Sequence, residues 1–231
     1  MANSAVRTDG NGSGSGSGKR RNRERDVVNA AINVFWRKGY AASSVQDVAD
    51  AVGVLKGSLY YYIDSKEELL FRIVDDVHQQ SRRILDEVVA LDGPPLERLG
   101  NYIERHVQWY LENVEEVSVY FRDWRYLTGE RLEIVAERRR GYDQVIRQLI
   151  VAAQKAGEVD PGVDPKYASF FLLAAVNHVP DWYRRDAADS AAKIARTYAD
   201  LAVGTLAGTR PRARAVDSTM ATRRRKRSAQ N

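Results

Sequence analysis

The sequence predicts an all-α protein of about nine helices. Apolar residues recur at spacings of three and four from residue 26 to residue 208, and the strict alternation typical of strands does not occur there. Glycine and proline interrupt this pattern at intervals that suit helices of ordinary globular length. We therefore expect an N-terminal helix-turn-helix domain over residues 19–70 and a second helical domain over residues 71–208.

The 231 residues carry a net charge of +5 that is spread unevenly along the chain. Residues 1–25 hold +4, residues 26–208 hold −6 and residues 209–231 hold +7. The glycine- and serine-rich residues 1–18 predict a disordered linker, and residues 209–231 predict a disordered basic tail. Basic ends can neutralise the phosphates of nucleic acid or anionic lipid, and the alternative is a solvated end without a partner.

Several classes of protein are excluded by what the sequence lacks. It has no run of 18 apolar residues, which argues against a transmembrane helix, and its polar N-terminus predicts no secretory signal. It has no cysteine, which excludes disulfides, thiol nucleophiles and cysteine-ligated metals. We expect a cytoplasmic protein with no membrane partner, no metal site and no cofactor.

The first two helices have clear boundaries. An apolar stripe that includes Val27 and Phe35 predicts a helix that ends at Gly39, because glycine tolerates the left-handed conformation common just after a helix. Ser43 or Ser44 is expected to cap a short second helix, which ends at Gly53.

The third and fourth helices follow directly. A third short helix is expected from Gly57 to about Tyr61. Ser65 and Glu68 have the spacing of a capping box, which predicts the start of a long helix that breaks before Gly93.

Five helical patterns follow in the second domain. They cover residues 95–112, 115–128, 130–156, 165–179 and 190–207. The 165–179 helix is apolar nearly all round, so we expect it to be buried on both sides. The last helix is rich in alanine, which allows close helix approach. Two such helices per subunit predict a four-helix dimer interface, and packing within one chain is the alternative.

Residues 44–62 combine two short helices with a turn at Gly53 and predict a helix-turn-helix. In that motif the second helix places its first side chains against base edges in the DNA major groove. An ordinary corner between two helices is the alternative on spacing alone.

The residues around the turn resemble one known family. Ser43 to Ala49, Val52-Gly53-Val54, Gly57 to Ile63 and Ser65 to Leu70 resemble the DNA-binding domain of TetR-family bacterial repressors. The resemblance covers about 50 residues. It implies an all-helical homodimer that binds a palindromic operator in double-stranded DNA and a C-terminal domain that binds a small effector.

The resemblance also implies the residues that contact DNA. Ser44, Tyr60 and Lys66 match phosphate contacts, while Lys56, Ser58 and Tyr61 lie near the exposed start of the recognition helix. Leu55 departs from the small hydroxyl residue usual in the family. It cannot cap a helix, so we expect it to contact a thymine methyl group.

The predicted reading head, residues 26–70, has a net charge of −2. Its affinity for phosphates should therefore depend on a flexible basic arm just upstream, which follows the DNA backbone or enters the minor groove. The cations of this arm that we expect to contact DNA are Lys19, Arg20, Arg21 and Arg23.

The second domain is rich in aromatic residues, which suit a mostly apolar ligand pocket. Asn177 to Arg184 and the helix after it also resemble a subgroup of actinobacterial TetR-type regulators that sense acyl-CoA esters of lipid or steroid catabolism. The arginines of residues 122–125 and 138–140 suit the phosphates of such a ligand, and a solvated helix face is the alternative for residues 138–140. The expected ligand-binding residues are Trp109, Phe121, Arg122, Trp124, Arg125, Tyr142, Asn177, His178 and Trp182.

The sequence thus predicts a TetR-type transcriptional regulator that a small effector, such as an acyl-CoA ester, releases from its operator. One alternative is a TetR-type regulator of an efflux or detoxification gene that senses a neutral aromatic ligand. An enzyme is a second alternative, but the chain has none of the common catalytic motifs. A nucleoid-like protein that binds DNA only through its basic tails is a third.

Overall fold

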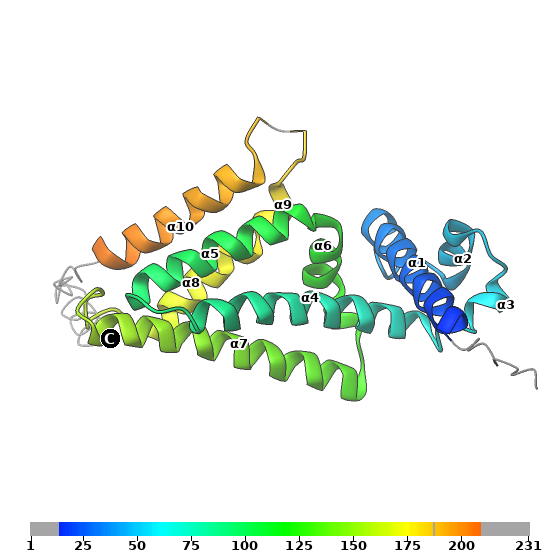
Figure 1. The fold of residues 1–231 in the computed structure, drawn as a ribbon, viewed down its shortest axis with the longest axis horizontal. Coiled ribbons are helices and arrows are strands. Elements are labelled where there is room, and N and C mark those ends of the chain that lie inside the picture. Colours follow the sequence, from blue (N-terminus) through cyan, green and yellow to red (C-terminus); the bar gives the residue numbers. More distant parts are fainter. Residues whose placement is uncertain (1–13, 187, 209–231) are drawn as a thin grey trace, which may run out of the picture.

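The computed structural model describes residues 14–186 and 188–208, and within these ranges it contains helices and no strand (Figure 1). The elements in chain order are α1 (Gly14–Lys38), α2 (Val45–Val52), α3 (Lys56–Leu59), α4 (Lys66–Val89), α5 (Pro95–Glu112), α6 (Val114–Asp123), the 3₁₀ turn η1 (Trp124–Tyr126), α7 (Gly129–Lys155), α8 (Pro165–Asn177), α9 (Val179–Trp182) and α10 (Ala191–Gly208). Among them no helix is long and apolar enough to cross a membrane. The predicted all-α fold is confirmed.

Each helix that the sequence predicts is present in the structure, which has one further short helix, α9. The expected helix over 165–179 ends at Asn177, and α9 follows as a single turn with Pro180 among its first residues. Proline is tolerated there because the first N–H groups of a helix have no partner within the helix.

The start of α1 differs from the prediction. The helix begins at Gly14, five residues inside the stretch expected to be a disordered linker. Once a helix has nucleated, each residue added to its end gains a hydrogen bond at low cost. The helix formed by the residues after 18 can therefore extend toward the N-terminus. Residues 1–13 and 209–231, which complete the predicted linker and form the predicted basic tail, lie outside the described residues.

The head consists of α1, α2, α3 and the start of α4, at one end of the molecule (Figure 1). Its core contains Phe35, Val48, Ala49 and Leu59, all fully buried, as the apolar spacing predicts. Gly53 ends α2 with φ +76°, a conformation that other residues rarely adopt. This geometry fixes the angle between α2 and α3.

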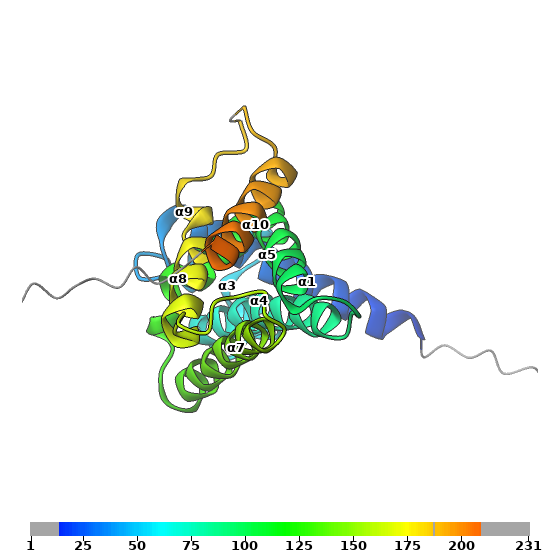
Figure 2. The ribbon, with the colours of Figure 1, turned by 90° about the vertical axis from the view of Figure 1, so that its left-hand side faces the viewer.

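The body is built on α4, which leaves the head and runs between α5 and α7 (Figures 1 and 2). The α4 helix continues without a break through residue 70, the expected domain boundary. Along α5 the chain approaches α10 closely, because Gly100 has no side chain and a Cβ there would come within 2.9 Å of Val203 Cγ2.

The α8 helix is not buried on both sides within one chain, contrary to the prediction. Ser169, Leu172 and Val176 face the body, whereas Tyr167 and Phe171 are 65% and 62% exposed. An apolar helix can present one face to its own chain and leave the other for a partner, so the apolar pattern alone does not say what covers each face.

Two cations hold the C-terminal end of α1 and the loop after it. The Lys66 ammonium on α4 donates to the carbonyl oxygens of Tyr40 at 2.8 Å and Ser43 at 2.7 Å. The Arg122 guanidinium on α6 donates to the carbonyl oxygens of Phe35 at 2.6 Å and Trp36 at 3.3 Å. Arg122 lies where the dipole of α1 favours positive charge and joins the head to the body, whereas Lys66 joins the loop after α1 to the start of α4 within the head.

We predict that Lys66→Met destabilises the protein by about 1–3 kcal/mol, because the Tyr40 and Ser43 carbonyls each lose a hydrogen bond from a charged donor while the apolar stem is kept. Urea unfolding followed by circular dichroism measures this loss. The matched control is Lys56→Met, which removes an exposed lysine and should change stability by less than about 0.5 kcal/mol. Equal stability of the two variants would contradict the assignment.

Candidate functional site

The α3 helix projects a largely exposed surface from the head. Leu55, Tyr60 and Tyr61 are 80%, 48% and 67% exposed, and Lys56 and Ser58 are also exposed. The next tyrosine, Tyr62, packs against the core, as expected for one of three successive positions. The residues around α3 that were predicted to read DNA are therefore exposed on the head.

Leu55 occupies the N-cap position of α3, and its side chain caps nothing, as the sequence predicts. A leucine at this position cannot accept a hydrogen bond from the first backbone N–H groups of the helix, and it does not pack in the core. Its large apolar side chain is therefore left facing solvent. Such a side chain is available for an apolar contact with a partner.

The basic segment before the head is helical and not a flexible arm, contrary to the prediction. Arg20, Arg21 and Arg23 lie on the early turns of α1, and Arg20 forms an ion pair with Glu24 at 3.1 Å. Arg20 also lies over the Tyr61 ring, 5.2 Å from its centroid. Intrahelical pairs and this cation–π contact favour the helix. Lys19 lies on α1, but its side chain is outside the described part of the chain.

Ser44 caps α2 in a reciprocal capping box. Its hydroxyl accepts from the Asp47 N–H at 3.2 Å, and its own N–H donates to the Asp47 carboxylate at 2.7 Å. Lys38 also bonds to this carboxylate and, with Ser44, lowers the pKa of Asp47 to about 2. Ser44 is exposed at the surface of the head while it caps α2.

Lys66 is not a solvated surface lysine. Two of its three N–H groups bond to the carbonyls of Tyr40 and Ser43, and its ammonium lies 4.2 Å from the centroid of the Tyr40 ring. Partial burial lowers the pKa of its ammonium. One N–H therefore remains for any contact outside the chain.

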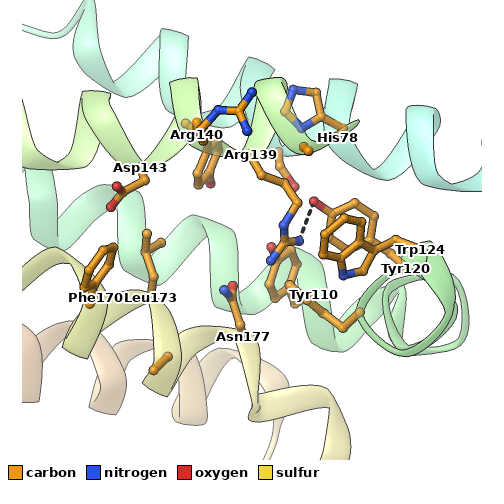
Figure 3. Close-up of a pocket in the computed structure, with 15 residues that line it drawn as sticks. His78, Tyr110, Tyr120, Trp124, Arg139, Arg140, Asp143, Phe170, Leu173 and Asn177 are labelled. Carbon is orange, nitrogen blue, oxygen red and sulfur yellow. Dashed lines mark hydrogen bonds between the residues drawn. The ribbon is translucent and has the colours of Figure 1, made fainter. Parts of the chain in front are cut away.

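A cavity of about 500 Å³ lies in the body among α4, α5, α6, α7 and α8. Figure 3 shows side chains from these helices that converge on it. It is lined by His78, Ser81, Tyr110, Tyr120, Phe121, Trp124, Ala136, Arg139, Arg140, Tyr142, Asp143, Phe170, Leu173, Ala174 and Asn177. Its volume is typical of pockets for small organic ligands.

Four of the nine predicted ligand residues line this cavity, and five do not. The four are Phe121, Trp124, Tyr142 and Asn177. Trp109 is instead partly buried against the core, and Arg122 bonds to α1. Sequence proximity to the lining residues was misleading here, because adjacent residues of a helix point in different directions.

The other three predicted residues lie outside the cavity. Arg125 is exposed, and its guanidinium lies 4.7 Å from the centroid of the Trp124 ring. His178 is exposed and bonds to Asp181 at 2.9 Å, while Trp182 stacks on Tyr198. The break between α8 and α9 turns both residues away from the lining of the cavity.

The cavity residues on α7 and α8 follow helical spacing, and of these the sequence interpretation named Asn177 and the arginines of residues 138–140 but missed the others. Ala136, Arg139, Arg140 and Asp143 lie at i, i+3, i+4 and i+7 on α7. Phe170, Leu173, Ala174 and Asn177 repeat the same spacing on α8. These stripes are visible in the sequence, but only the packing of α7 against α8 says that they face each other.

Arg139 is the central polar group of the cavity. It donates to the Tyr120 hydroxyl at 2.9 Å, the bond drawn in Figure 3, and lies 4.8 Å from the Trp124 ring and 5.9 Å from the Phe121 ring. Within the described residues it has no carboxylate partner. A half-buried guanidinium held by rings and one hydroxyl retains N–H groups for an anion.

The remaining charges do not cancel this positive charge. Asp143 is the acidic residue in the lining, and it pairs with Arg147 and accepts from Ser169 at 2.9 Å. Burial lowers the pKa of His78 to about 4, with a contribution from Arg138, so its imidazole is neutral at pH 7. The cavity is therefore apolar with a cationic side formed by Arg139 and Arg140.

A buried hydrogen-bond network supports the wall formed by Tyr142. Its hydroxyl lies 3.1 Å from Nδ1 of the fully buried His106 and also bonds to Tyr102. Burial lowers the pKa of His106 to about 3, which keeps the imidazole neutral and makes this histidine structural. In the part of the chain with described coordinates, no cluster of three or more acidic or histidine side chains could hold a metal ion.

Residues 120–128 connect the cavity with the head. Tyr120, Phe121 and Trp124 line the cavity, whereas Arg122 bonds to α1. The Arg122 guanidinium is fixed by the buried Asp123 at 2.8 Å. Beyond them, the Tyr126 ring lies 5.4 Å from the Tyr40 ring, and the Thr128 N–H donates to Glu67 of α4 at 2.8 Å.

Two family models match most of the described chain. One, described as "Bacterial regulatory proteins, tetR family", matches residues 27–73, and one described as "Tetracyclin repressor-like, C-terminal domain" matches residues 92–206. The first covers the helix-turn-helix and the second covers the helices that enclose the cavity.

Individual relatives agree with these models. The HTH-type transcriptional repressor KstR2 of Rhodococcus jostii (strain RHA1) is 26% identical over 187 residues, which are 79% of this chain and 90% of the relative. The fatty acid metabolism regulator protein of Bacillus subtilis (strain 168) is 22% identical over 161 residues, which are 69% of this chain and 83% of the relative. The crystal structure of AibR in complex with isovaleryl coenzyme A and operator DNA has 26% identity and a TM-score of 0.71, covering 80% of this chain and 97% of AibR.

These relatives are named as regulators and not as enzymes. The helix-turn-helix with its exposed α3, the helical body with its cavity, and both family models agree. The chain belongs to the TetR family of bacterial transcriptional regulators.

Proposed function

We propose that this TetR-family protein is a homodimeric repressor that binds a palindromic operator and is released by a small, largely apolar anion such as an acyl-CoA ester. The observation that carries the proposal is the segment 120–128, which lines the cavity on one side and is bonded to the head on the other. A ligand in the cavity thereby acts on the position of the head.

The DNA-reading surface is proposed to have two parts. Leu55, Lys56 and Ser58, at the exposed start of α3, contact base edges and so specify the sequence. The positioning groups contact phosphates, and their contacts carry no sequence information. These positioning groups are Lys19, Arg20, Arg21, Arg23, Ser44, Tyr60, Tyr61 and the remaining N–H of Lys66.

The dimer interface is proposed to form from α8 and α10, as the sequence predicts. Tyr167 and Phe171 on α8 and Leu201 on α10 are each more than 60% exposed in one chain. Large apolar side chains gathered on neighbouring helices mark interaction surfaces. A second copy related by a two-fold axis would cover them and place two heads on successive major grooves.

The chemistry of the cavity supports an amphiphilic anion. Six of its fifteen lining residues are phenylalanine, tyrosine or tryptophan, and Arg139 and Arg140 give it a cationic side without a free acidic residue nearby. An acyl chain suits the apolar part, and the phosphates of CoA suit the arginines, with Arg140 exposed. AibR, a structural neighbour, was crystallised with isovaleryl coenzyme A, and the Bacillus subtilis relative is named for fatty acid metabolism.

Release requires the ligand to prefer the form of the protein whose heads are misaligned with the operator. A ligand that reorients Arg139 or Trp124 shifts the residues that hold α1 and the start of α4. A preference of ~100-fold for the released form corresponds to about 2.7 kcal/mol, which is within the range usual for allosteric coupling.

A neutral aromatic ligand is the second candidate effector, as for a regulator of efflux or detoxification. The observation that favours it is the ring-rich lining, with Tyr110, Phe121, Trp124 and Phe170 around the same space. Arg139 separates the two candidates, because only an anion gains from its unpaired charge.

We predict that Leu55→Ala changes the base preferred at one operator position, whereas Tyr60→Phe weakens binding about 3- to 10-fold at every sequence tested. Loss of a base contact alters discrimination, and loss of one phosphate hydrogen bond weakens affinity uniformly. Fluorescence anisotropy with single-base operator variants measures both effects. Lys155→Ala, at the far end of α7, is the control and should change neither. A uniform loss for Leu55→Ala would refute its role as a base contact.

We predict that the protein sediments as a dimer at micromolar concentration and that Phe171→Glu converts it to a folded monomer with at least 10-fold weaker operator binding. Burying a carboxylate in an apolar interface without a partner is strongly unfavourable. Analytical ultracentrifugation measures the mass. The control is Leu91→Glu, which adds the same charge at a 45% exposed leucine outside α8 and α10. A dimeric Phe171→Glu variant would place the interface elsewhere.

We predict that Arg139→Gln weakens binding of medium-chain acyl-CoA esters at least 10-fold and abolishes their effect on operator affinity. The variant keeps a polar but shorter side chain and removes the charge that faces the cavity. Isothermal titration with several chain lengths, and with free CoA, measures the affinities. The control is Arg131→Gln, two turns earlier on α7 and outside the lining. If no ester binds more tightly than free CoA, the acyl-CoA proposal fails and the neutral ligand is preferred.

A further inference from the structure

The described lining of the cavity contains one carboxamide, and the fold does not use it. Asn177 is the last residue of α8, and its half-buried side chain points into the cavity (Figure 3). Its amide forms no hydrogen bond with any part of the chain that the structure describes, and the amide atoms remain accessible and are not sealed in the core. The amide is therefore available to a molecule that enters the cavity.

Other amides in the body show what a structural role looks like. Asn113, which like Asn177 lies at the C-terminal end of a helix, donates from Nδ2 to the Trp109 carbonyl at 2.9 Å. The Gln154 Nε2 group donates to two carbonyl oxygens of the loop after α7, at 3.0 and 2.8 Å. Asn177 makes neither kind of contact, although the carbonyls of the last turn of α8 offer the same option.

The hydroxyl groups around the cavity are already engaged within the protein. The Tyr120 hydroxyl accepts from Arg139, and the Tyr110 phenol lies in hydrogen-bonding relation to the Ser81 hydroxyl. The Tyr142 hydroxyl belongs to the buried network that supports its wall. A ligand would have to displace a partner to bond to any of these groups, whereas the Asn177 amide requires no such exchange.

The uncharged polar side chains of the described lining that have no such partner are His78 and Asn177. The His78 imidazole lies beside the ion pair of Asp75 and Arg138, at the charged edge between α4 and α7. Asn177 instead ends the stripe of α8 that faces the cavity, and the other members of that stripe are apolar. It is therefore the group on α8 that can recognise a polar atom within an otherwise apolar ligand.

We propose that Asn177 is a specificity-determining residue of the cavity and that the effector presents an uncharged amide group to it. The side-chain amide has an oxygen that accepts and an NH₂ group that donates, so it pairs with both the N–H and the C=O of a ligand amide. This inference rests on the proposed effector role of the cavity and adds a neutral recognition point to the cationic side formed by Arg139 and Arg140. An acyl-CoA ester carries amides between its thioester and its phosphates. A plain hydrocarbon at this place leaves the Asn177 amide without a partner, and the site discriminates against it.

The test compares two anions of equal chain length that differ by one amide, which N-decanoylglycine contains and tridecanoate lacks. Isothermal titration of the full chain gives both affinities for wild type and for Asn177→Leu, which keeps the size of the side chain and removes its hydrogen bonds. We expect Asn177→Leu to weaken N-decanoylglycine about 3- to 10-fold and to leave tridecanoate unchanged or bound more tightly. The preference for the amide over the hydrocarbon therefore falls at least about threefold. A smaller change in that preference overturns the proposal.

Uncharged probes separate this inference from the proposed anion site. Naphthalene-2-carboxamide and 2-isopropenylnaphthalene have similar shapes, carry no charge and differ in the amide. If neither anion binds but the carboxamide is preferred in an Asn177-dependent way, the anionic effector fails and the role of Asn177 stands. If the anions bind through Arg139 and Asn177→Leu leaves their ratio unchanged, the role of Asn177 fails and the anion site stands. If none of the four probes binds, both proposals fail.

Asn113→Leu is the matched control, because it removes a half-buried amide that is bonded within the protein and lies outside the cavity lining. It should leave the ratio of the two anion affinities unchanged and lower Tm by about 2–4 °C without ligand. Asn177→Leu removes an unbonded amide and should leave Tm unchanged or raise it. A loss of Tm at Asn177 equal to that at Asn113 would show that the amide serves the fold, and would overturn the proposal.

Discussion

The Arg122 guanidinium, bonded to carbonyl groups at the end of α1, holds the head on the body, and Lys66 holds the loop after α1 in place within the head. Arg122 reaches these carbonyls from α6, and Lys66 reaches the loop after them from α4. Neither contact involves a complementary carboxylate on the head, so the junction depends on backbone geometry and on the direction of the helix dipole. The helices of the head can keep their own core while their placement is set entirely from the body.

The cavity and this junction share one short stretch of chain. Along residues 120–128, side chains that line the cavity alternate with side chains that bond to the head. Three rings of this stretch surround the Arg139 guanidinium, which has no acidic partner of its own. We propose that Arg139 either stays on these rings or bonds to a ligand, and that this choice links the cavity to the head.

Much of the head was predictable from sequence, because its signals are local. The cap at Ser44, the stop at Gly53 and the buried Leu59 all depend on neighbours within a few residues. The cavity was only partly predictable. Phe121 and Trp124 were identified by composition and the arginines of residues 138–140 by their charge. That Arg139 and Arg140 rather than Arg138 line the cavity, and that Ser81 does, depends on how α4 and α7 pack. Arg122, expected from the sequence to bind the ligand, instead bonds to the end of α1, a contact between helices that the sequence does not show.

The unbroken length of α4 has a mechanical consequence. Its 24 residues span about 36 Å, from Lys66 under the head to Val89 at the far end of the body, with His78 and Ser81 near the middle. A rigid rod of this length that pivots by ~5° about its far end moves its other end by about 3 Å. In a symmetric dimer two such rods turn in opposite directions, so the change in spacing between the heads is twice the displacement of either one. For the proposed release from DNA, a small rotation of α4 would thus be amplified into a change of about 6 Å in the spacing of the two heads.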